Sequence, residues 1–324
     1  MRFATGVKPR SLPESIEGRA FSVREARELG VSCRRPDHVS PTRGVRAAQA
    51  PSDVVERARA FQVGLGERTA YSHVTAAELW CLPLPRSLEG QTALDVMTTT
   101  RGGQVLRAGC QGHRGLERRD ITLVDDLRVT ALPETWCDLA ELGRRRLGVE
   151  DLVVIGDTCV RLLDEGRRAD VRPGATTSPG VRALHEALGR RVRPRGKVML
   201  REALDLIRPR VKSPMESRAR LMFVRAGFPE PVVNLPILDE AGDFLAEGDL
   251  VWPDQRVIGE YQGEHHADRR RRSADSGRGH LLRSHIWTHE ELWAEDVFHR
   301  PRRIAALRRF AEHLDLDPKT LLIA

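Results

Sequence analysis

The sequence is poor in lysine, in aromatic residues and in long apolar runs. Aromatic residues make up 5% of the 324 residues. No stretch approaches 18 consecutive apolar residues, so we expect no transmembrane helix. The N-terminus lacks the apolar core of a secretory signal, and we therefore expect a cytoplasmic protein. Of the 53 basic residues all but four are arginine, the lysines being Lys8, Lys197, Lys212 and Lys319.

Closely spaced cysteines are also missing. The chain has five cysteines, none of them in a Cys-x-x-Cys pair, which argues against a structural zinc site. Their odd number and wide spacing argue against a disulfide framework. We interpret them as reduced, mostly core residues: Cys33, Cys81, Cys110, Cys137 and Cys159.

The net charge of +7 is unevenly distributed. Residues 196–324 carry 21 basic and 21 acidic side chains, so the whole excess lies in residues 1–195. This balance favours a polyanionic partner for the first two-thirds of the chain. The dominance of arginine also fits a GC-rich genome, so arginine content alone is weak support for phosphate contacts.

Residues 1–50 read as an arm followed by one short helix. Residues 1–17 are polar, and a helix is expected within Phe21–Ser32, with Ser22 and Glu25 forming a capping box. A second helix from Ser32, as in a helix-turn-helix, would be cut short by Pro36. The segment is either a degraded winged-helix start or an ordinary helix.

Residues 51–170 form an expected α+β region. The apolar spacing and turn residues predict helices at 53–63, 71–80, 134–142 and 149–165, strands at 93–99 and 105–113, and a hairpin over 120–130. Asp125 and Asp126 form the turn of this hairpin. No catalytic cluster is evident, and His73 has no partner nearby in the sequence, so we favour a packed or exposed histidine over a ligand.

Residues 171–211 are expected to be a linker with connecting helices. The segment 167–180 is rich in Arg, Gly, Pro, Ser and Thr, and helices follow at 181–188 and 198–207. Between them lies a basic run, residues 190–197. We favour a solvated surface segment over a dedicated phosphate contact.

Residues 212–324 have the pattern of an α/β domain. Ser213, Pro214 and Glu216 are a helix start with a cap, a proline at the first position and an acid at the third. Strands are expected at 232–238 and 285–288, a hairpin at 248–266, and helices at 290–293 and 301–314. This order predicts a mixed sheet layered with helices.

The hairpin carries acids where strands should be apolar. Asp249 opens its first apolar run, Glu260 lies near the end of the second, and Gln262, His265 and His266 follow at once. Two carboxylates beside an amide and imidazoles are a candidate divalent-metal site. The alternative is that Asp249 is a strand-end cap and Glu260 is paired with an arginine; His265 and His266 are equally compatible with a solvated turn.

Several separate segments of residues 212–310 resemble the DUF559 family. Its members are similar to very-short-patch-repair endonucleases and share the restriction-endonuclease-like, PD-(D/E)xK fold. Residues 72–80 and 127–136 carry a second, weaker resemblance: the first two-thirds of the chain resemble an AbiEi-type antitoxin region with a winged-helix start. The DUF559-like segments are Ser-Pro-Met-Glu-Ser-Arg, Gly-Phe-Pro-Glu-Pro-Val-Val-Asn, Gly-Asp-Leu-Val-Trp-Pro and Gly-Glu-Tyr-Gln-Gly-Glu-His-His.

The resemblance implies a Mg²⁺ site, with Mn²⁺ as a substitute. Asp249 matches the first acid of the motif and Glu260 the second, and both would ligate the metal together with the carbonyl of Tyr261. Glu216 matches an additional acid of the fold, and His266 a histidine that follows the family's glycine. The implied reaction is hydrolysis of a DNA phosphodiester bond.

Gln262 departs from the family pattern. It stands at the lysine position of the motif, where family members usually have aspartate, and an amide can orient a water but cannot be its base. Residues 276–279, Ser-Gly-Arg-Gly, also interrupt a stretch that is usually a continuous basic helix. Two hypotheses follow: a Mg²⁺-dependent DNA endonuclease, or a catalytically degenerate DNA-binding regulator of antitoxin type. The N-terminal region is also a candidate for binding a protein partner.

Overall fold

The computed structural model describes residues 11–33, 37–239, 241–263 and 287–323. Its contacts divide the chain into two compact units: unit 1 is Met1–Glu141 with Arg190–Val192, and unit 2 is Leu142–Gly189 with Arg193–Ala324. The predicted boundaries after residues 50, 170 and 211 do not coincide with this division. Within the described ranges no helix is long and apolar enough to span a membrane.

Unit 1 begins with the predicted capped helix. Helix α1 (Val23–Glu28) starts after Ser22, whose Oγ accepts the Glu25 N–H at 3.0 Å. The strand β1 (Phe21–Ser22) pairs antiparallel with β2 (Val45–Arg46), a pairing that the sequence did not predict. Residues 34–36 lie outside the described part, and from 37 to 53 the structure describes no helix.

A five-stranded sheet follows, in the order β5-β4-β3-β7-β6. The hairpin of β6 and β7 turns at Asp125 and Asp126, as predicted, and both residues have left-handed backbones with φ of 48° and 65°. The strand expected at 105–113 is shorter than predicted and pairs parallel with β4. The bounds are β3 Thr69–Tyr71, β4 Leu94–Thr98, β5 Cys110–Arg114, β6 Ile121–Val124 and β7 Leu127–Thr130.

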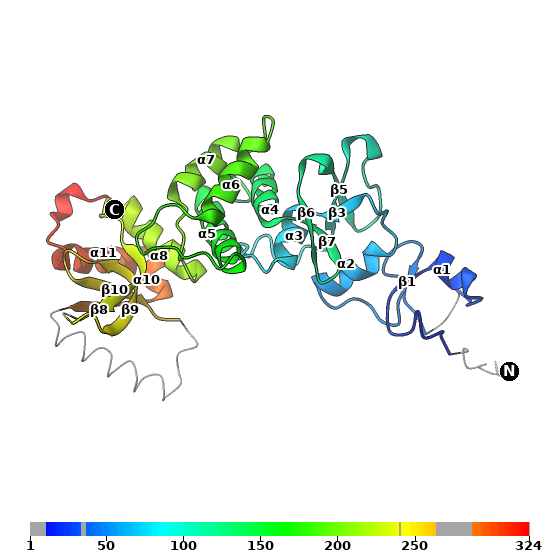
Figure 1. The fold of residues 1–324 in the computed structure, drawn as a ribbon, viewed down its shortest axis with the longest axis horizontal. Coiled ribbons are helices and arrows are strands. Elements are labelled where there is room, and N and C mark those ends of the chain that lie inside the picture. Colours follow the sequence, from blue (N-terminus) through cyan, green and yellow to red (C-terminus); the bar gives the residue numbers. More distant parts are fainter. Residues whose placement is uncertain (1–10, 34–36, 240, 264–286, 324) are drawn as a thin grey trace. The chain divides into compact units, whose positions relative to one another are not determined.

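The predicted helices of this region are present as α2 (Val54–Gln62), α3 (His73–Leu79) and α4 (Leu132–Leu139). Helices α2 and α3 lie beside the sheet in Figure 1, and their apolar side chains share one core cluster with strands β3, β4 and β7. The sheet and these helices together build the scaffold of unit 1 because each buries an apolar face that it cannot bury alone.

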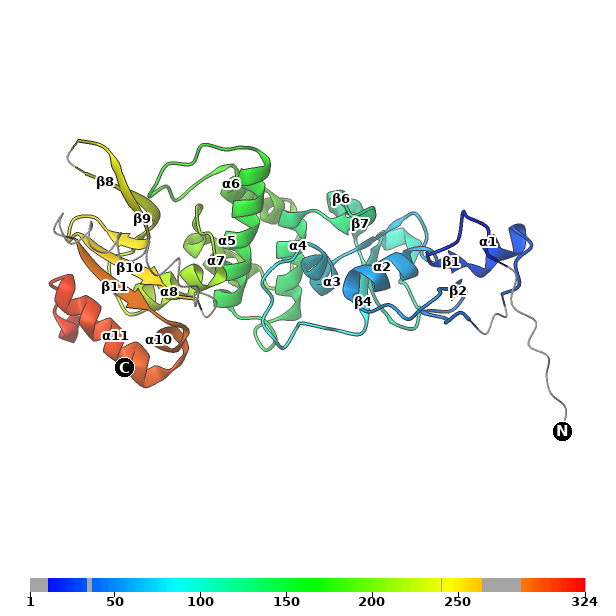
Figure 2. The ribbon, with the colours of Figure 1, turned by 90° about the horizontal axis from the view of Figure 1, so that it is seen from below.

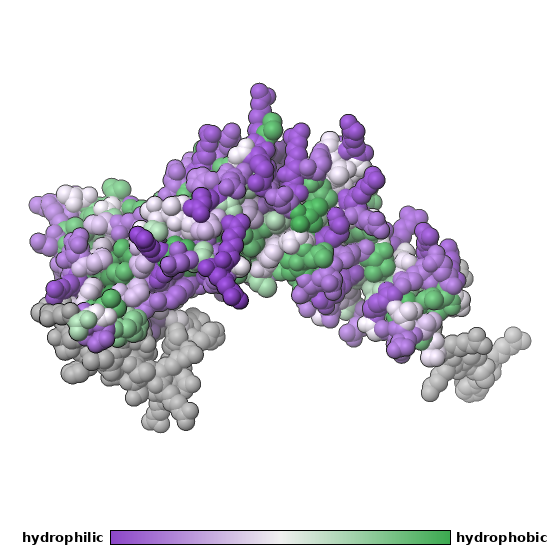
Figure 3. Space-filling view, viewed as in Figure 1, coloured by the Kyte–Doolittle hydropathy of each residue, from purple (hydrophilic) through white to green (hydrophobic). Residues whose placement is uncertain are grey.

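The basic run at 190–197 is not a uniformly solvated segment. Arg191 is buried and donates to Glu134 Oε2 at 2.5 Å and to Asp138 Oδ1 at 2.6 Å. Arg190 donates to Glu134 Oε1 at 2.6 Å and to Asp120. Our surface interpretation was therefore wrong for Arg191, because buried carboxylates distant in sequence bind it, whereas Arg190 stays exposed while it pairs with Glu134. In the rest of the run, Val192, Arg193 and Arg195 are exposed. Figure 3 shows a mostly hydrophilic surface over α6 and α7.

Unit 2 starts with four helices, all predicted in outline: α5 (Val149–Gly166), α6 (Pro179–Arg190), α7 (Lys197–Leu206) and α8 (Pro214–Arg225). Helix α5 contacts both α7 and α8. This packing is why the helices that we expected to be a linker belong to the same unit as the C-terminal sheet.

The sheet of unit 2 has four strands in the order β11-β10-β9-β8. Strands β10 and β11 are parallel and the other pairs antiparallel, so the sheet is mixed, as predicted. Helices α8, α10 (Ala294–Phe298) and α11 (Arg300–His313) pack against one face, as Figure 2 shows, and share an apolar core with it. The strands are β8 Val232–Leu238, β9 Phe244–Trp252, β10 Val257–Tyr261 and β11 Thr288–Leu292.

The predicted helix at 290–293 is wrong. Those residues lie mostly in β11, which pairs along its length with β10. The glutamates there have good helix propensity, but pairing with a distant strand overrides a local preference of a few tenths of a kcal/mol per residue.

Candidate functional site

Asp249 is the centre of the candidate site in unit 2. It lies on β9 within the predicted hairpin, and its Oδ2 accepts the backbone N–H of Tyr261 on β10 at 2.9 Å. Burial raises the pKa of Asp249 to about 7, and the negative charges of Glu216 and Glu260 act in the same direction. A carboxyl group that ionises this reluctantly is a group that a cation would stabilise.

Asn234 lies opposite Asp249 and has an unusual backbone for a strand residue. The pairs Val233–Leu250 and Leu235–Gly248 flank Asn234 and Asp249 on strands β8 and β9. Asn234 has φ of 47°, a left-handed conformation that asparagine adopts more readily than most residues. Its side chain is buried and places an amide, rather than an apolar group, beside Glu216.

Glu216 reaches the site from the first turn of α8. The helix starts as predicted, with Ser213 Oγ accepting the Glu216 N–H at 3.2 Å. The carboxylate of Glu216 is buried, and its Oε2 accepts from the Lys212 N–H at 2.9 Å and from Asn234 Nδ2 at 2.6 Å. Local capping therefore positions the third acid that the family resemblance implied.

Glu260 has a histidine partner. His289 on β11 lies with Nε2 2.5 Å from Glu260 Oε2, and the parallel pairing of β10 with β11 brings the two side chains together. Both side chains are only partly exposed. The imidazole holds the Glu260 carboxylate in one orientation, whichever group carries the proton.

Lys212 supplies a cation at the same place. Its ammonium forms an ion pair with Glu247 of β9, and its charge opposes the rise in the pKa of Asp249. Lys212 and Glu247 also line an open cleft in unit 2, together with three arginines of α5 and the adjoining loops, Arg161, Arg168 and Arg210. Four acids, Asp164, Glu165, Asp170 and Glu247, line the same cleft, so its basic and acidic side chains are equal in number.

The remaining expected site residues are only partly placed. The backbone N–H of Gln262 donates to Leu292 O at 2.8 Å and so extends the pairing of β10 with β11 by one residue. Its neighbour Tyr261 donates to Asp249 as described, and both side chains are half-buried. His265, His266 and the arginines at 269–272 lie outside the described residues.

Sequence reasoning missed Lys212, Asn234 and His289. A signal for Lys212 existed, since it is one of four lysines in the chain and stands directly before the capped helix. His289 lies in the segment that we assigned in part to a helix. Asn234 ends one of the DUF559-like segments, but its contact with Glu216 could not be predicted, because it depends on how β8 and α8 pack.

Carboxylate, carbonyl and amide oxygens are hard ligands, and that donor set suits Mg²⁺. Glu216, Asp249 and Glu260 nevertheless do not converge as closely as a second group does. The second group is His73, Asp138 and Glu141 in unit 1, whose ligand atoms all lie within 4.8 Å of one another. It is the one such group of three within residues 11–33, 37–239, 241–263 and 287–323. A metal at Asp249 would thus take part of its ligand set from water or substrate, as Mg²⁺ commonly does.

Comparison with known proteins places the chain beside two mycobacterial proteins. It is 37% identical over 134 residues to "Uncharacterized protein MT2308" of Mycobacterium tuberculosis (strain CDC 1551 / Oshkosh) and to "Uncharacterized protein Rv2248" of strain ATCC 25618 / H37Rv. The matched stretch covers 41% of this chain and 47% of each relative, so the chain spans about half the length of these relatives. No family model matches the chain, and no solved structure is significantly similar to it.

Proposed function

We propose that unit 2 is a restriction-endonuclease-like, DUF559-type nuclease that hydrolyses DNA phosphodiester bonds with Mg²⁺ or Mn²⁺. The observation that carries the proposal is Asp249: a half-buried carboxyl whose pKa is raised to about 7 by burial and by the charges of Glu216 and Glu260. Gathering several carboxylates in a poorly solvated site is costly, and a divalent cation would relieve that cost.

The donor set assigns a role to each side chain. Asp249 and Glu260 would hold the metal, together with the carbonyl of Tyr261, which directly follows Glu260 in the sequence. A Mg²⁺ ion held there would lower the pKa of an attacking water and draw charge from the phosphate. Gln262 would orient the water through its amide, and Lys212 would stabilise the charge that develops on the phosphate.

The alternative is a catalytically inactive DNA-binding regulator of antitoxin type. Gln262 favours it, because the amide cannot accept the proton that a catalytic base must take. The spacing of Glu216, Asp249 and Glu260 also favours it, because their ligand atoms do not all lie within 4.8 Å of one another as those of the His73 group do. In that case the protein would bind the phosphates of duplex DNA without cleaving it, with the basic side chains of the unit 2 cleft as candidate contacts.

Plasmid cleavage tests the enzyme proposal. Supercoiled DNA is incubated with the protein in Mg²⁺, Mn²⁺ or EDTA, and nicked and linear products are quantified. We expect metal-dependent cleavage that falls by about 100-fold or more in Asp249→Ala and Glu260→Ala, since each removes a charged metal ligand. Asp254→Ala is the matched control, because Asp254 is exposed at the turn of the same hairpin and should leave the rate unchanged.

Cleavage that both substitutions leave intact would refute the assignment of the site. An absence of cleavage together with a salt-sensitive gel shift on duplex DNA would favour the regulator. Protein that neither cleaves nor binds duplex at low salt would exclude both proposals.

Replacing Lys212 by methionine should slow cleavage by about 100-fold, because the site loses a positive charge directed at the phosphate. The side-chain volume stays similar, so folding should be little affected. Lys197→Met at the start of α7 is the control, and should retain the wild-type rate. A wild-type rate for Lys212→Met, measured in the same plasmid assay, would remove Lys212 from the site.

A further inference from the structure

Unit 1 contains a cluster that the proposed nuclease chemistry does not use. His73 at the start of α3, Asp138 at the end of α4 and Glu141 in the turn that follows each offer a ligand atom, all within 4.8 Å of one another. We propose that these three residues bind a divalent transition-metal ion of the Zn²⁺ or Mn²⁺ class. One imidazole with two carboxylates is a donor set that suits such ions.

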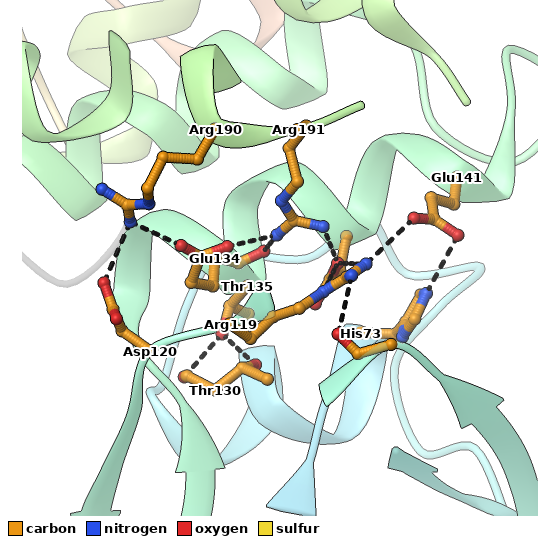
Figure 4. Close-up of polar contacts among 11 residues, drawn as sticks. His73, Arg119, Asp120, Thr130, Glu134, Thr135, Glu141, Arg190 and Arg191 are labelled. Carbon is orange, nitrogen blue, oxygen red and sulfur yellow. Dashed lines mark hydrogen bonds and ion pairs between the residues drawn. The ribbon is translucent and has the colours of Figure 1, made fainter. Parts of the chain in front are cut away.

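The histidine is oriented for this role. Ser72 Oγ lies 3.0 Å from His73 Nδ1, which leaves Nε2 facing Glu141 Oε2 at 3.8 Å, too far for a hydrogen bond. Figure 4 shows the His73 ring and the Glu141 carboxylate pointing toward each other. The His73 ring also stacks on the His113 ring, with the ring centroids 3.7 Å apart. His113 is held in turn by Asp95, whose Oδ1 lies 2.8 Å from His113 Nε2. Such outer contacts fix the tautomer and orientation of metal-binding histidines.

Asp138 provides an independent indication. Its side chain is fully buried, and its Oδ1 accepts from Arg119 at 2.9 Å and from Arg191 at 2.6 Å. Its Oδ2 is buried without a hydrogen-bond partner. A buried carboxylate oxygen normally has a partner, and leaving it without one costs about 1–3 kcal/mol or more. A bound cation would satisfy this oxygen.

The charge balance of the surrounding network points the same way. The carboxylates outnumber the guanidinium groups by one, so with a neutral His73 the network carries a net charge of −1. Ion pairs join the acids Asp120, Glu134, Asp138 and Glu141 to the arginines Arg119, Arg190 and Arg191. Figure 4 labels all of these residues except Asp138. Glu141 keeps 28% of its side chain exposed, which leaves the cluster a route to solvent.

Metal titration of the full chain tests the inference. Protein stripped with chelator is titrated calorimetrically with Zn²⁺, and separately with Mn²⁺, in an Asp249→Ala background that removes the proposed nuclease metal site. We expect one equivalent to bind, and an affinity at least about 100-fold lower in His73→Ala and in Glu141→Gln, since each loses a ligand. Glu141→Gln keeps the size of the partly exposed side chain and so guards against misfolding. His185→Ala, an exposed histidine of α6, should bind like the parent.

Two outcomes would overturn the inference. The first is no stoichiometric binding of either ion to the parent protein. The second is binding that neither His73→Ala nor Glu141→Gln weakens. Since every protein in the series lacks Asp249, a failure here leaves the nuclease proposal untouched, and a failure of plasmid cleavage leaves this one untouched.

Discussion

Asp249→Asn is expected to stabilise the metal-free protein at pH 8 while abolishing its metal-dependent cleavage. In the native state the pKa of Asp249 is raised to about 7, whereas an unfolded aspartate ionises near pH 3.9. Ionisation therefore favours the unfolded chain. Asparagine has no charge to bury, and its amide oxygen can still accept the Tyr261 N–H.

The sign of the pH dependence follows from this shift. Below about pH 4 both states are protonated and Asp249 costs nothing. Between about pH 4 and pH 7 only the unfolded state has lost the proton, so wild-type stability falls; above pH 7 the loss is constant. Three pKa units correspond to an upper limit of about 4 kcal/mol. Because Asp249 is partly exposed, we expect a gain of about 1–3 kcal/mol for the variant at pH 8.

Urea unfolding without divalent ions, followed by tryptophan fluorescence from pH 4.5 to 8, measures this effect. The difference between the variant and the wild type should be small at the acid end, grow to about pH 7 and then stay level. Asp254→Asn, at the exposed turn of the hairpin, should change stability by less than about 0.5 kcal/mol throughout. A difference in unfolding free energy between Asp249→Asn and the wild type that stays the same at every pH would contradict the raised pKa. Saturating Mg²⁺ should stabilise the wild type but not the variant.

Arg220→Met is expected to destabilise unit 2 by about 3–5 kcal/mol. Arg220 is fully buried on α8 and donates to Asp157 of α5 at 3.2 Å, to Leu206 O at 2.7 Å and to Glu230 at 2.7 Å. Burial raises the pKa of Asp157 despite the attraction of Arg220, so the loss of the guanidinium leaves a poorly compensated buried acid. Methionine fills much of the space but cannot donate.

The consequence should reach the candidate site. Asp157 also accepts from Ser217 at 2.8 Å, so this network fixes the helix turn that carries Glu216. We therefore expect Arg220→Met to lower cleavage as well as the urea midpoint. Arg225→Met is the matched control: it lies on the same helix, is about half exposed in its ion pair with Glu150, and should cost less than about 1 kcal/mol.

A double substitution distinguishes the contribution of the Arg220–Asp157 ion pair to stability from that of Arg220 packing. If Asp157 is the group left uncompensated, Asp157→Asn combined with Arg220→Met should lose less stability than the two single losses added together. Additive losses would assign the effect of Arg220 to its packing and its other hydrogen bonds instead.

Local signals in the sequence determined most of the elements near the site. Ser213, Pro214 and Glu216 start α8 because a cap, a fixed proline φ and an acid at the third position act within one turn. The turn at 125–126 was equally predictable, since such a turn depends on the residues within it. Asp249 and Glu260 stood out as acids interrupting apolar strands.

The tertiary structure decided which groups meet. His289 reaches Glu260 through the parallel pairing of β10 with β11, and His73 meets Asp138 across more than sixty residues of sequence. The segment at 290–293 became a strand for the same reason. Residues far apart are brought together by the burial of apolar faces and by strand pairing, which the local pattern does not encode. The sequence by itself therefore determined the helix starts, the turns and the identity of two acids. Only the fold decided the pKa of Asp249, the burial of Arg191 and Arg220, and the cluster around His73, because each depends on charges and desolvation supplied by distant elements.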